Sequence, residues 1–305
     1  MTHIVDPKSP LIKQIVGTHF FGFDGAPCSQ RVAFALAEKG VMRGRSVPWN
    51  SAAPKHVQSD PGTYTFRNVS LVKNQNLTTE YAAIQPNLVV PALVHDGELH
   101  IESMEIIAEL DQWWPENPLL PTDPERARLN EELVEEGKRL HKSIRHITFN
   151  WSLGPVGKIS PELQAQAKSL EQPDSPEQLA DFHARFSSGE IEAETFQQHL
   201  HALETGYAAQ DARLKGDGRQ FLTGDTLTAA DIIWAIKVLR LVECGYPFAE
   251  NFPYLAEWYR RVSARPAFKD GVLARNRLFH YAFRAKSRVE RLFGGGIRAA
   301  SQVRA

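Results

Sequence analysis

The sequence predicts a fold in two parts, an α/β unit up to about residue 115 and an all-α unit after it. Short apolar runs separated by turn residues alternate with helical stripes in the first part. Four prolines then interrupt every regular pattern and indicate a linker: Pro115, Pro118, Pro121 and Pro124. From residue 125 onward, apolar residues recur with the period of a helix almost to the end of the chain.

Length and composition indicate a globular protein with a sizeable core. The chain has 305 residues, of which 42% are hydrophobic and 23% charged. Two cysteines cannot form a disulfide framework, which suits a reducing compartment. No apolar run reaches the roughly 18 residues that a membrane span needs, and the N-terminus lacks the pattern of a secretory signal. We expect a cytoplasmic protein.

Charge is distributed unevenly. Residues 271–305 contain eight basic residues and one acid, while the whole chain has 35 basic and 36 acidic residues. The other 270 residues therefore carry a net charge of −8. A body this acidic argues against nucleic acid as a partner, because binding phosphates requires a basic face.

The first predicted unit is a strand, a turn and a helix. Residues 19–23 are short and aromatic, Asp24-Gly25 ends the strand, and a helical stripe follows to Gly40. Cys28 lies at the start of this helix, where the helix dipole stabilises a thiolate. The alternative for Cys28 is a buried, inert side chain, which is our prediction for Cys244 in a later apolar helix.

The residue pattern is less regular in the rest of the first part. Residues 44–68 carry no clear period, and we interpret them as an irregular excursion. Residues 69–72 are the next candidate strand. Residues 86–101 contain two apolar runs around Asp96-Gly97, which predicts a β-hairpin. A helix follows, starting at Glu102-Ser103.

The second part is predicted to be helical. One long helix covers residues 129–151, a loop with a short helix covers 152–190, and a further helix covers 196–207. Residues 231–242 are apolar on nearly every side, as in a buried central helix. Thr228 and Asp231 have the spacing of a capping box that starts it.

Over residues 19–275 the chain resembles glutathione transferases. The region around Cys28 and the Val89-Val90-Pro91 segment are most similar to the zeta-type enzymes and to bacterial reductive dechlorinases of chlorinated hydroquinones. The resemblance implies an N-terminal extension at 1–18, a thioredoxin-like glutathione-binding domain at 19–115, a linker at 116–124, an all-helical substrate domain at 125–275, and a basic amphipathic helix and tail at 276–305.

The resemblance also implies a glutathione site. Pro91 would follow a cis peptide bond, with the main chain of Val90 bound to the cysteinyl part of glutathione. Glu102 and Ser103 would hold the γ-glutamyl end at a helix N-terminus. The alternatives are an ordinary trans proline and a plain helix cap. Many relatives have a lysine or glutamine where this chain has Leu88-Val89, so Lys73 and Gln75 are our candidates for the glycyl carboxylate.

Cys28 is the predicted catalytic residue. The zeta pattern has two serines before this cysteine, whereas this chain has Ala26 and Pro27. Their loss makes simple conjugation less favoured. The resemblance places the acceptor-substrate residues on the first helices of the second part, each with surface or packing placement as the alternative: His141, Arg145, Thr148 and Trp151. We expect no metal site.

The expected activity is glutathione-dependent thiol exchange on a small, hydrophobic, aromatic electrophile, like reductive dehalogenation in aromatic compound degradation. The alternatives are β-ether cleavage, simple conjugation, isomerisation and a non-catalytic binding module. The resemblance to this family also implies a homodimer.

The C-terminal region predicts an amphipathic helix over residues 277–293, with arginines on one face and apolar residues on the other. The preferred interpretation is a C-terminal helix docked on the acidic body, whose net charge of −8 makes it a complementary partner. The alternative is weak contact with an anionic membrane surface.

Overall fold

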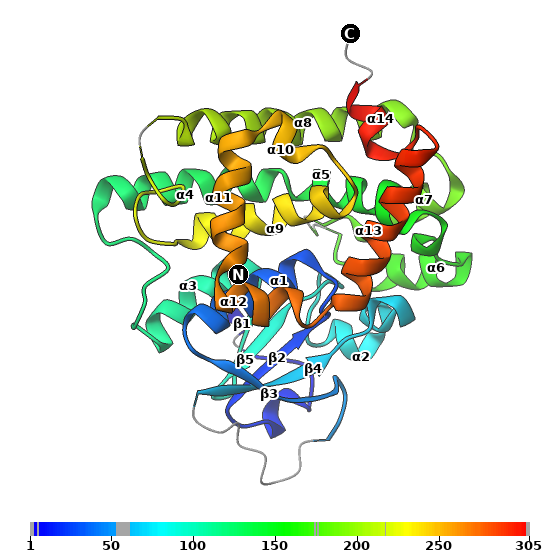
Figure 1. The fold of residues 1–305 in the computed structure, drawn as a ribbon. Helices are drawn as coiled ribbons and strands as arrows, with labels where there is room; N and C mark the ends of the chain where they lie inside the picture. Colours follow the sequence, from blue (N-terminus) through cyan, green and yellow to red (C-terminus); the bar gives the residue numbers. More distant parts are fainter. Residues whose placement is uncertain are drawn as a thin grey trace. The chain divides into compact units, whose positions relative to one another are not determined.

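The computed structural model describes residues 3–4, 6–52, 62–173, 175, 177–216 and 218–302 (Figure 1). Contacts divide the chain into two compact units. The first consists of Met1–Asn117 and Ile159–Ser188, and the second of Pro118–Lys158 and Gly189–Ala305. The sequence placed the whole of residues 125–275 in one helical domain, whereas Ile159–Ser188 makes its contacts within the first unit.

The first unit is built on a mixed sheet. Its strands are β1 (His3–Ile4), β2 (Thr18–Gly22), β3 (Met42–Pro48), β4 (Thr63–Asn68), β5 (Ala92–His95) and β6 (Glu98–Ile101), in the order β1-β6-β5-β2-β4-β3. Strand β4 runs parallel to β2 and β3, while β5 is antiparallel to β2 and β6. The predicted hairpin is the β5–β6 pair, and β1 extends the sheet at one edge.

Part of the predicted excursion is regular structure. Residues 44–68 include most of β3 and all of β4, and residues 53–61 between them lie outside the described part. Arg43 of β3 forms an ion pair with Asp24, in the turn that precedes the first helix. The strand predicted at 69–72 is wrong. The chain leaves the sheet after Asn68 and forms a 3-10 helix, Leu71–Lys73, in which the Ser70 hydroxyl accepts the Lys73 N–H.

Helices cover both faces of this sheet. They are α1 (Pro27–Glu38), α2 (Thr79–Ala82) and α3 (Ser103–Trp113), with short 3-10 turns at Ile12–Gln14 and Gln75–Leu77. Tyr81 joins a buried cluster with Phe21 and Val94 on one face. His100 faces the opposite way and contacts Trp113 at the end of α3, which packs on α1.

Two helices from the middle of the chain complete the first unit. The sequence predicted a loop with one short helix at 152–190, but the structure has α6 (Pro161–Leu170) and α7 (Leu179–Ser188). Ala167 and Leu179 form a buried cluster with Leu77 and Leu88. This segment therefore covers the loop that precedes β5.

The second unit is helical. Its elements are α4 (Pro124–Arg139), α5 (His141–Ile147), a π-helix (Thr148–Leu153), a 3-10 turn (Gly154–Gly157), α8 (Ala193–Leu214), α9 (Ala229–Glu243), α10 (Phe248–Asn251), α11 (Pro253–Ala264), α12 (Pro266–Phe268), a second π-helix (Lys269–Leu273), α13 (Arg277–Leu292) and α14 (Gly296–Gln302). The long helix predicted at 129–151 is thus divided at Leu140 and again at Thr148.

Helix α9 is the buried centre of the second unit. Thr228 and Asp231 form the capping box at its start. Helix α4 approaches it so closely that a Cβ at Gly137 would lie 2.8 Å from the terminal methyl of Ile233, so a larger residue would require Ile233 to shift.

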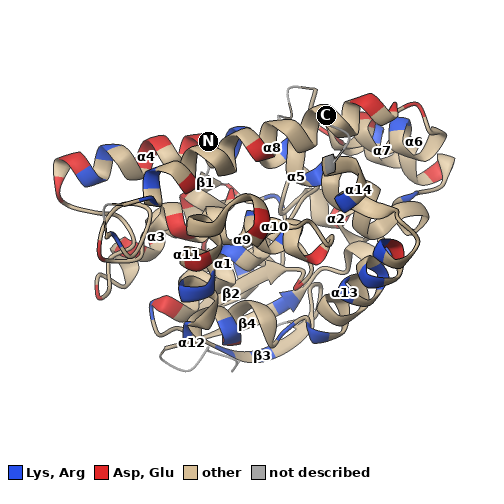
Figure 2. Cartoon of the chain, turned by 45° about the horizontal axis from the view of Figure 1, so that its top comes forward, with Lys and Arg blue, Asp and Glu red and all other residues tan. Residues whose placement is uncertain are grey.

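The C-terminal helix α13 is present and packs against α9 of the second unit. Its Leu278, Tyr281, Val289 and Leu292 are exposed, whereas Phe279 and Phe283 are half-buried. Figure 2 shows that Lys and Arg positions predominate along it. None of the described helices combines the length and the apolar content that a membrane span requires.

Candidate active site

The turn between β2 and α1 presents Cys28. Pro27 occupies the first position of α1, where its missing N–H costs nothing, and Cys28 is the second residue. The Phe23 N–H donates to the Ser29 hydroxyl at 3.2 Å, and the Gln30 amide donates to the Asp24 carbonyl at 2.9 Å. Ser29 is buried and its hydroxyl already accepts a hydrogen bond, whereas Cys28 is only half-buried. Of these two side chains, only that of Cys28 is partly accessible.

Arg31 connects Cys28 to the start of α3. Its Nη1 donates to the Cys28 Sγ at 3.6 Å and to the Ser103 Oγ at 3.3 Å, and the residue is 3% exposed. A permanent cation fixed beside a sulfur interacts favourably with a thiolate. Arg31 was not among the predicted site residues. Its position three residues after Cys28, on the same side of the helix, was the available signal.

The loop before β5 has the geometry that the resemblance implied. The Val90–Pro91 peptide bond is cis. Side chains hold the carbonyls on either side of Val90: the Tyr81 hydroxyl donates to Val89 at 3.0 Å, and the Gln85 amide donates to Pro91 at 3.3 Å. Burial raises the pKa of Tyr81, so its hydroxyl remains a donor. Among the described residues, the main-chain N–H and C=O of Val90 have no partner, which suits an added extended segment.

Glu102 and Ser103 stand at the N-terminus of α3. Glu102 has a φ of 67°, a conformation that costs energy for a residue with a side chain and is concentrated at functional sites. Its carboxylate accepts from the Asn87 amide at 3.0 Å. The first N–H groups of α3 attract an anion, and the Glu102 carboxylate attracts a cation. Together the pair suits the carboxylate and ammonium groups of an α-amino acid.

The two candidates for the glycyl carboxylate have different surroundings. Lys73 is exposed at the end of its 3-10 turn. The side-chain oxygen of Gln75, Oε1, accepts the Ser70 N–H at 2.8 Å. Leu88 is fully buried against α6 and α7, so it serves packing and leaves no side chain at this point for a carboxylate.

The four predicted acceptor residues lie in α5 and the π-helix that follows it. They are half-buried: His141, Arg145, Thr148 and Trp151. π-Helical turns occur frequently at functional sites. The Thr148 hydroxyl is buried with no hydrogen-bond partner among the described residues, and the Trp151 ring meets Phe196 edge to face.

Two histidines beside this segment were not predicted as site residues. His146 stacks on His199 at 3.8 Å, and the Ser143 hydroxyl bonds the His199 Nδ1 at 3.0 Å. Burial, with the positive charges of His146 and Lys142, lowers the pKa of His199 to about 4. His199 is therefore neutral at physiological pH and acts as a hydrogen-bonding ring.

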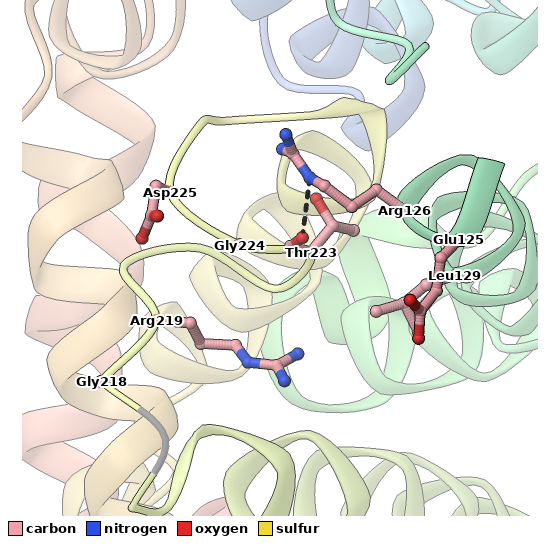
Figure 3. Close-up of a pocket in the computed structure, with 8 residues that line it drawn as sticks. All are labelled: Glu125, Arg126, Leu129, Gly218, Arg219, Thr223, Gly224 and Asp225. Atoms are coloured by element: carbon pink, nitrogen blue, oxygen red, sulfur yellow. Dashed lines mark hydrogen bonds between the residues drawn. The ribbon is translucent and has the colours of Figure 1, made fainter. Parts of the chain in front are cut away.

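The second unit has a surface hollow of about 470 Å³, and the arginines that line it have a structural role (Figure 3). Arg126 on its wall donates to the Thr223 carbonyl at 3.0 Å and to the Thr226 hydroxyl at 2.7 Å, and Arg219 donates to the Leu222 carbonyl at 3.1 Å. Both arginines thus stabilise the loop before α9. None of the predicted site residues lines this hollow.

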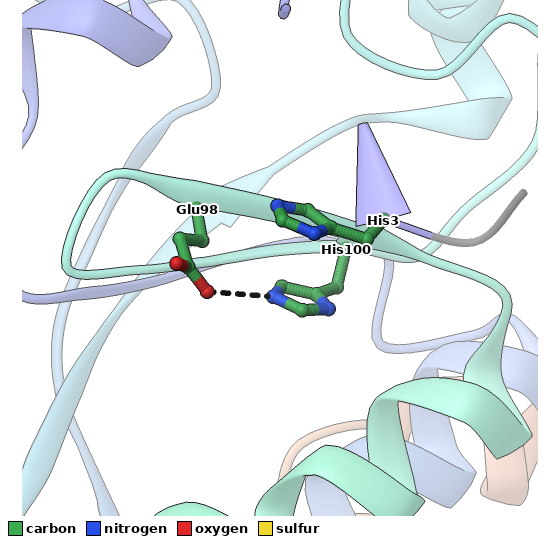
Figure 4. Close-up of side chains that lie close together, drawn as sticks. All are labelled: His3, Glu98 and His100. Atoms are coloured by element: carbon green, nitrogen blue, oxygen red, sulfur yellow. Dashed lines mark ion pairs between the residues drawn. The ribbon is translucent and has the colours of Figure 1, made fainter. Parts of the chain in front are cut away.

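One cluster in the described part of the chain has the residue types of a metal site: His3, Glu98 and His100 (Figure 4). The two imidazole rings stack at 4.8 Å with an angle of 6° between their planes, and the His100 Nε2 lies 3.7 Å from the Glu98 carboxylate. The nitrogen lone pairs of an imidazole lie in the plane of its ring. Because the two ring planes are almost parallel, the lone pairs of His3 and His100 do not converge on one ion. This geometry fits a stacked pair with an ion pair better than a coordination sphere.

Comparison with known proteins identifies the class of protein. Residues 20–118 match the N-terminal domain of glutathione S-transferase, and residues 163–266 match its C-terminal domain. The chain belongs to the glutathione transferase family and is a glutathione-dependent transferase. The fold predicted from the resemblance, a thioredoxin-like unit with a helical unit, is confirmed.

Similar proteins come from more than one class of the family. A zeta-class glutathione S-transferase of Euphorbia esula is 22% identical over 273 residues, 89% of this chain and 94% of the relative. Glutathione S-transferase theta-3 of mouse is 27% identical over 208 residues, 66% of this chain and 72% of the relative. Among solved structures, the β-etherase LigF of a Sphingobium strain has a TM-score of 0.69 at 20% identity, covering 84% of this chain and 98% of that one.

Proposed function

We propose that the protein is a glutathione-dependent thiol-exchange enzyme that removes a halide from a small aromatic electrophile. The observation that carries this proposal is the shared contact of Arg31 with the Cys28 sulfur and the Ser103 hydroxyl. Glutathione would lie along Val90 and Pro91, with its γ-glutamyl end at Glu102 and Ser103. Cys28 would then stand beside bound glutathione as a second thiol.

The reaction has three balanced steps. A glutathione thiolate attacks the halogen-bearing ring carbon of the quinone-like form of the substrate, a C–S bond forms, and halide leaves with the bonding electrons. The Cys28 thiolate attacks the sulfur of this thioether, so an S–S bond forms, the C–S bond breaks, and the ring carbon takes a proton. A second glutathione thiolate attacks the mixed disulfide and releases glutathione disulfide. The ring is reduced and two glutathione thiols are oxidised.

The acceptor ring would be recognised by residues of the second unit. Trp151 offers an aromatic surface, and Thr148, His141 and Arg145 offer groups that bind a phenolic or quinone oxygen. We expect this enzyme to act as a homodimer, as its family resemblance implies.

The test uses glutathione and a chlorinated hydroquinone with the wild type, Cys28→Ser and the matched control Cys244→Ser. We expect wild type and Cys244→Ser to release halide and form the reduced ring with one glutathione disulfide per turnover. Cys28→Ser should stop at the glutathione thioether. Formation of the reduced ring by Cys28→Ser at the wild-type rate would refute the proposed role of Cys28.

Cleavage of an aromatic β-ether is the second candidate. Two observations favour it. The fold resembles that of a β-etherase. Ser29, the only residue with a hydroxyl in the first turn of α1, is buried, and its hydroxyl accepts the Phe23 N–H. This reaction displaces a phenolate with glutathione and needs no cysteine. Release of phenol from a β-aryl ether at equal rates by wild type and Cys28→Ser would select it, and no release by either would remove it.

A further inference from the structure

Polar contacts hold helix α13 to the second unit. His280 is buried and forms an ion pair with Glu243 of α9. The Lys286 ammonium donates to the Trp151 carbonyl at 2.7 Å. A Cβ at Gly245 would lie 2.6 Å from the Cβ of Ser287, so the helix sits directly on the main chain at Gly245. These contacts fix which sides of α13 face outward.

The outward side is apolar to an unusual degree. Large hydrophobic side chains are exposed there: Leu278 (78%), Tyr281 (73%), Val289 (53%), Leu292 (80%) and Phe293 (86%). They are five of the ten large hydrophobic residues that the structure records as exposed in its described part. Isolated exposed hydrophobics are ordinary, but a group of this size on one helix marks an interaction surface.

A row of arginines borders this apolar surface. On a helical projection, four exposed arginines adjoin its edge: Arg277, Arg284, Arg288 and Arg291. The single acidic residue of the helix, Glu290, forms an ion pair with Lys286 on the docked side. The outward side of α13 is therefore apolar and cationic, with no acidic group.

We propose that α13 binds the surface of an anionic membrane, lying in the headgroup region with its apolar side chains inserted. Arginine side chains beside an inserted apolar stripe reach the lipid phosphates. The first 270 residues carry a net charge of −8 and are repelled by such a surface, so contact falls to the outward side of α13. An antiparallel two-fold pairing of α13 with its copy would bring the two arginine rows to the same side of the pair, which disfavours that pairing.

The test is co-sedimentation of the full chain with vesicles of pure phosphatidylcholine and with vesicles containing about 30 mol % phosphatidylserine. We expect binding to the anionic vesicles. Leu292→Ser/Phe293→Ser should weaken this binding at least about tenfold because both side chains are exposed and removable. Arg284→Gln/Arg288→Gln should weaken it about fivefold per arginine on anionic vesicles only.

Matched controls lie outside α13. Val72→Ser/Val156→Ser removes two exposed hydrophobics, and Arg128→Gln/Arg261→Gln removes two arginines of exposed or half-exposed ion pairs. Both controls should bind like the wild type, and all variants should keep the wild-type circular dichroism.

Two results would overturn the proposal. One is a wild type that does not bind anionic vesicles, or whose binding survives both sets of α13 changes. The other is concentration-dependent self-association that Leu292→Ser/Phe293→Ser abolishes in the absence of vesicle binding. That result would assign the surface to a second copy of the chain.

Discussion

The two cysteines of the chain lie at opposite ends of their helices and in opposite surroundings. Cys28 is the second residue of α1, half-buried, with the Arg31 guanidinium beside its sulfur. Cys244 follows the last residue of α9, is 2% exposed, and shares a hydrogen bond of 2.9 Å with the Ser152 hydroxyl. Burial raises the pKa of Cys244 to about 12. The two cysteines therefore differ in position on the helix, in burial and in neighbouring charge, and this difference is the basis of our prediction that Cys28 is the reactive one.

Alkylation should show the largest difference between these two regions. With iodoacetamide at pH 8 and no denaturant, we expect Cys28 to react at least about a thousandfold faster than Cys244, which is buried and almost wholly protonated. Peptide mapping by mass spectrometry measures the two rates separately. Equal rates in the folded protein would break the comparison, and rapid labelling of Cys244 in denaturant is the control for reagent access.

Glu243→Gln tests whether the end of α9 is a structural network. Glu243 is buried between Arg240, at 2.9 Å, and His280. Removing its charge leaves the buried Arg240 cation without its carboxylate, so the free energy of unfolding should fall by about 3 kcal/mol. Guanidinium chloride titration measures this change. Glutathione affinity at 25 °C should stay unchanged, and a large loss of that affinity would contradict the separation of the two regions.

Arg31→Gln tests the corresponding arginine at the start of α1. Loss of the charged contact to Ser103 should raise the dissociation constant of glutathione about tenfold, and Cys28 should alkylate more slowly. Calorimetric titration with glutathione measures the first effect. Ser29→Ala is the matched control, since Ser29 bonds the main chain at Phe23 and should alter stability but not affinity.

Cys244→Ala should have the smallest effect, about 1 kcal/mol of stability, because it leaves the Ser152 hydroxyl without its partner. A thiol whose pKa is raised from 9 to about 12 by folding holds its proton more tightly in the folded state. Its contribution to stability is therefore full below pH 9 and is lost as the pH rises toward 12. The alanine variant should lack this alkaline component of the stability profile in thermal scans from pH 8 to pH 11.

The local features of the candidate glutathione site could be predicted from the sequence. Val90-Pro91 and Glu102-Ser103 are short motifs whose surroundings, a hairpin between them and a helix after them, are also local. The capping box of Thr228 and Asp231 is likewise contained within four residues. Such features depend on nearby main-chain geometry, which neighbouring residues largely determine.

Features that depend on distant parts of the chain were missed. The contact of Arg31 with Ser103 joins residues 72 positions apart. Packing of α6 and α7 on Leu88 was hidden because the segment lies far along the chain, inside the helical part. For α13 the amphipathic pattern was correct, but the side that docks could not be predicted, because the buried partner of His280, Glu243, lies on another helix.

The most direct test of the central claim is the intact mass of the protein after incubation with glutathione disulfide, for wild type, Cys28→Ser and Cys244→Ser in parallel. If Cys28 is a reactive thiol beside a glutathione site, wild type and Cys244→Ser will each gain one glutathionyl group, and Cys28→Ser will gain none. A wild type that binds glutathione but gains no adduct, or an adduct that persists in Cys28→Ser, would contradict the assignment of Cys28.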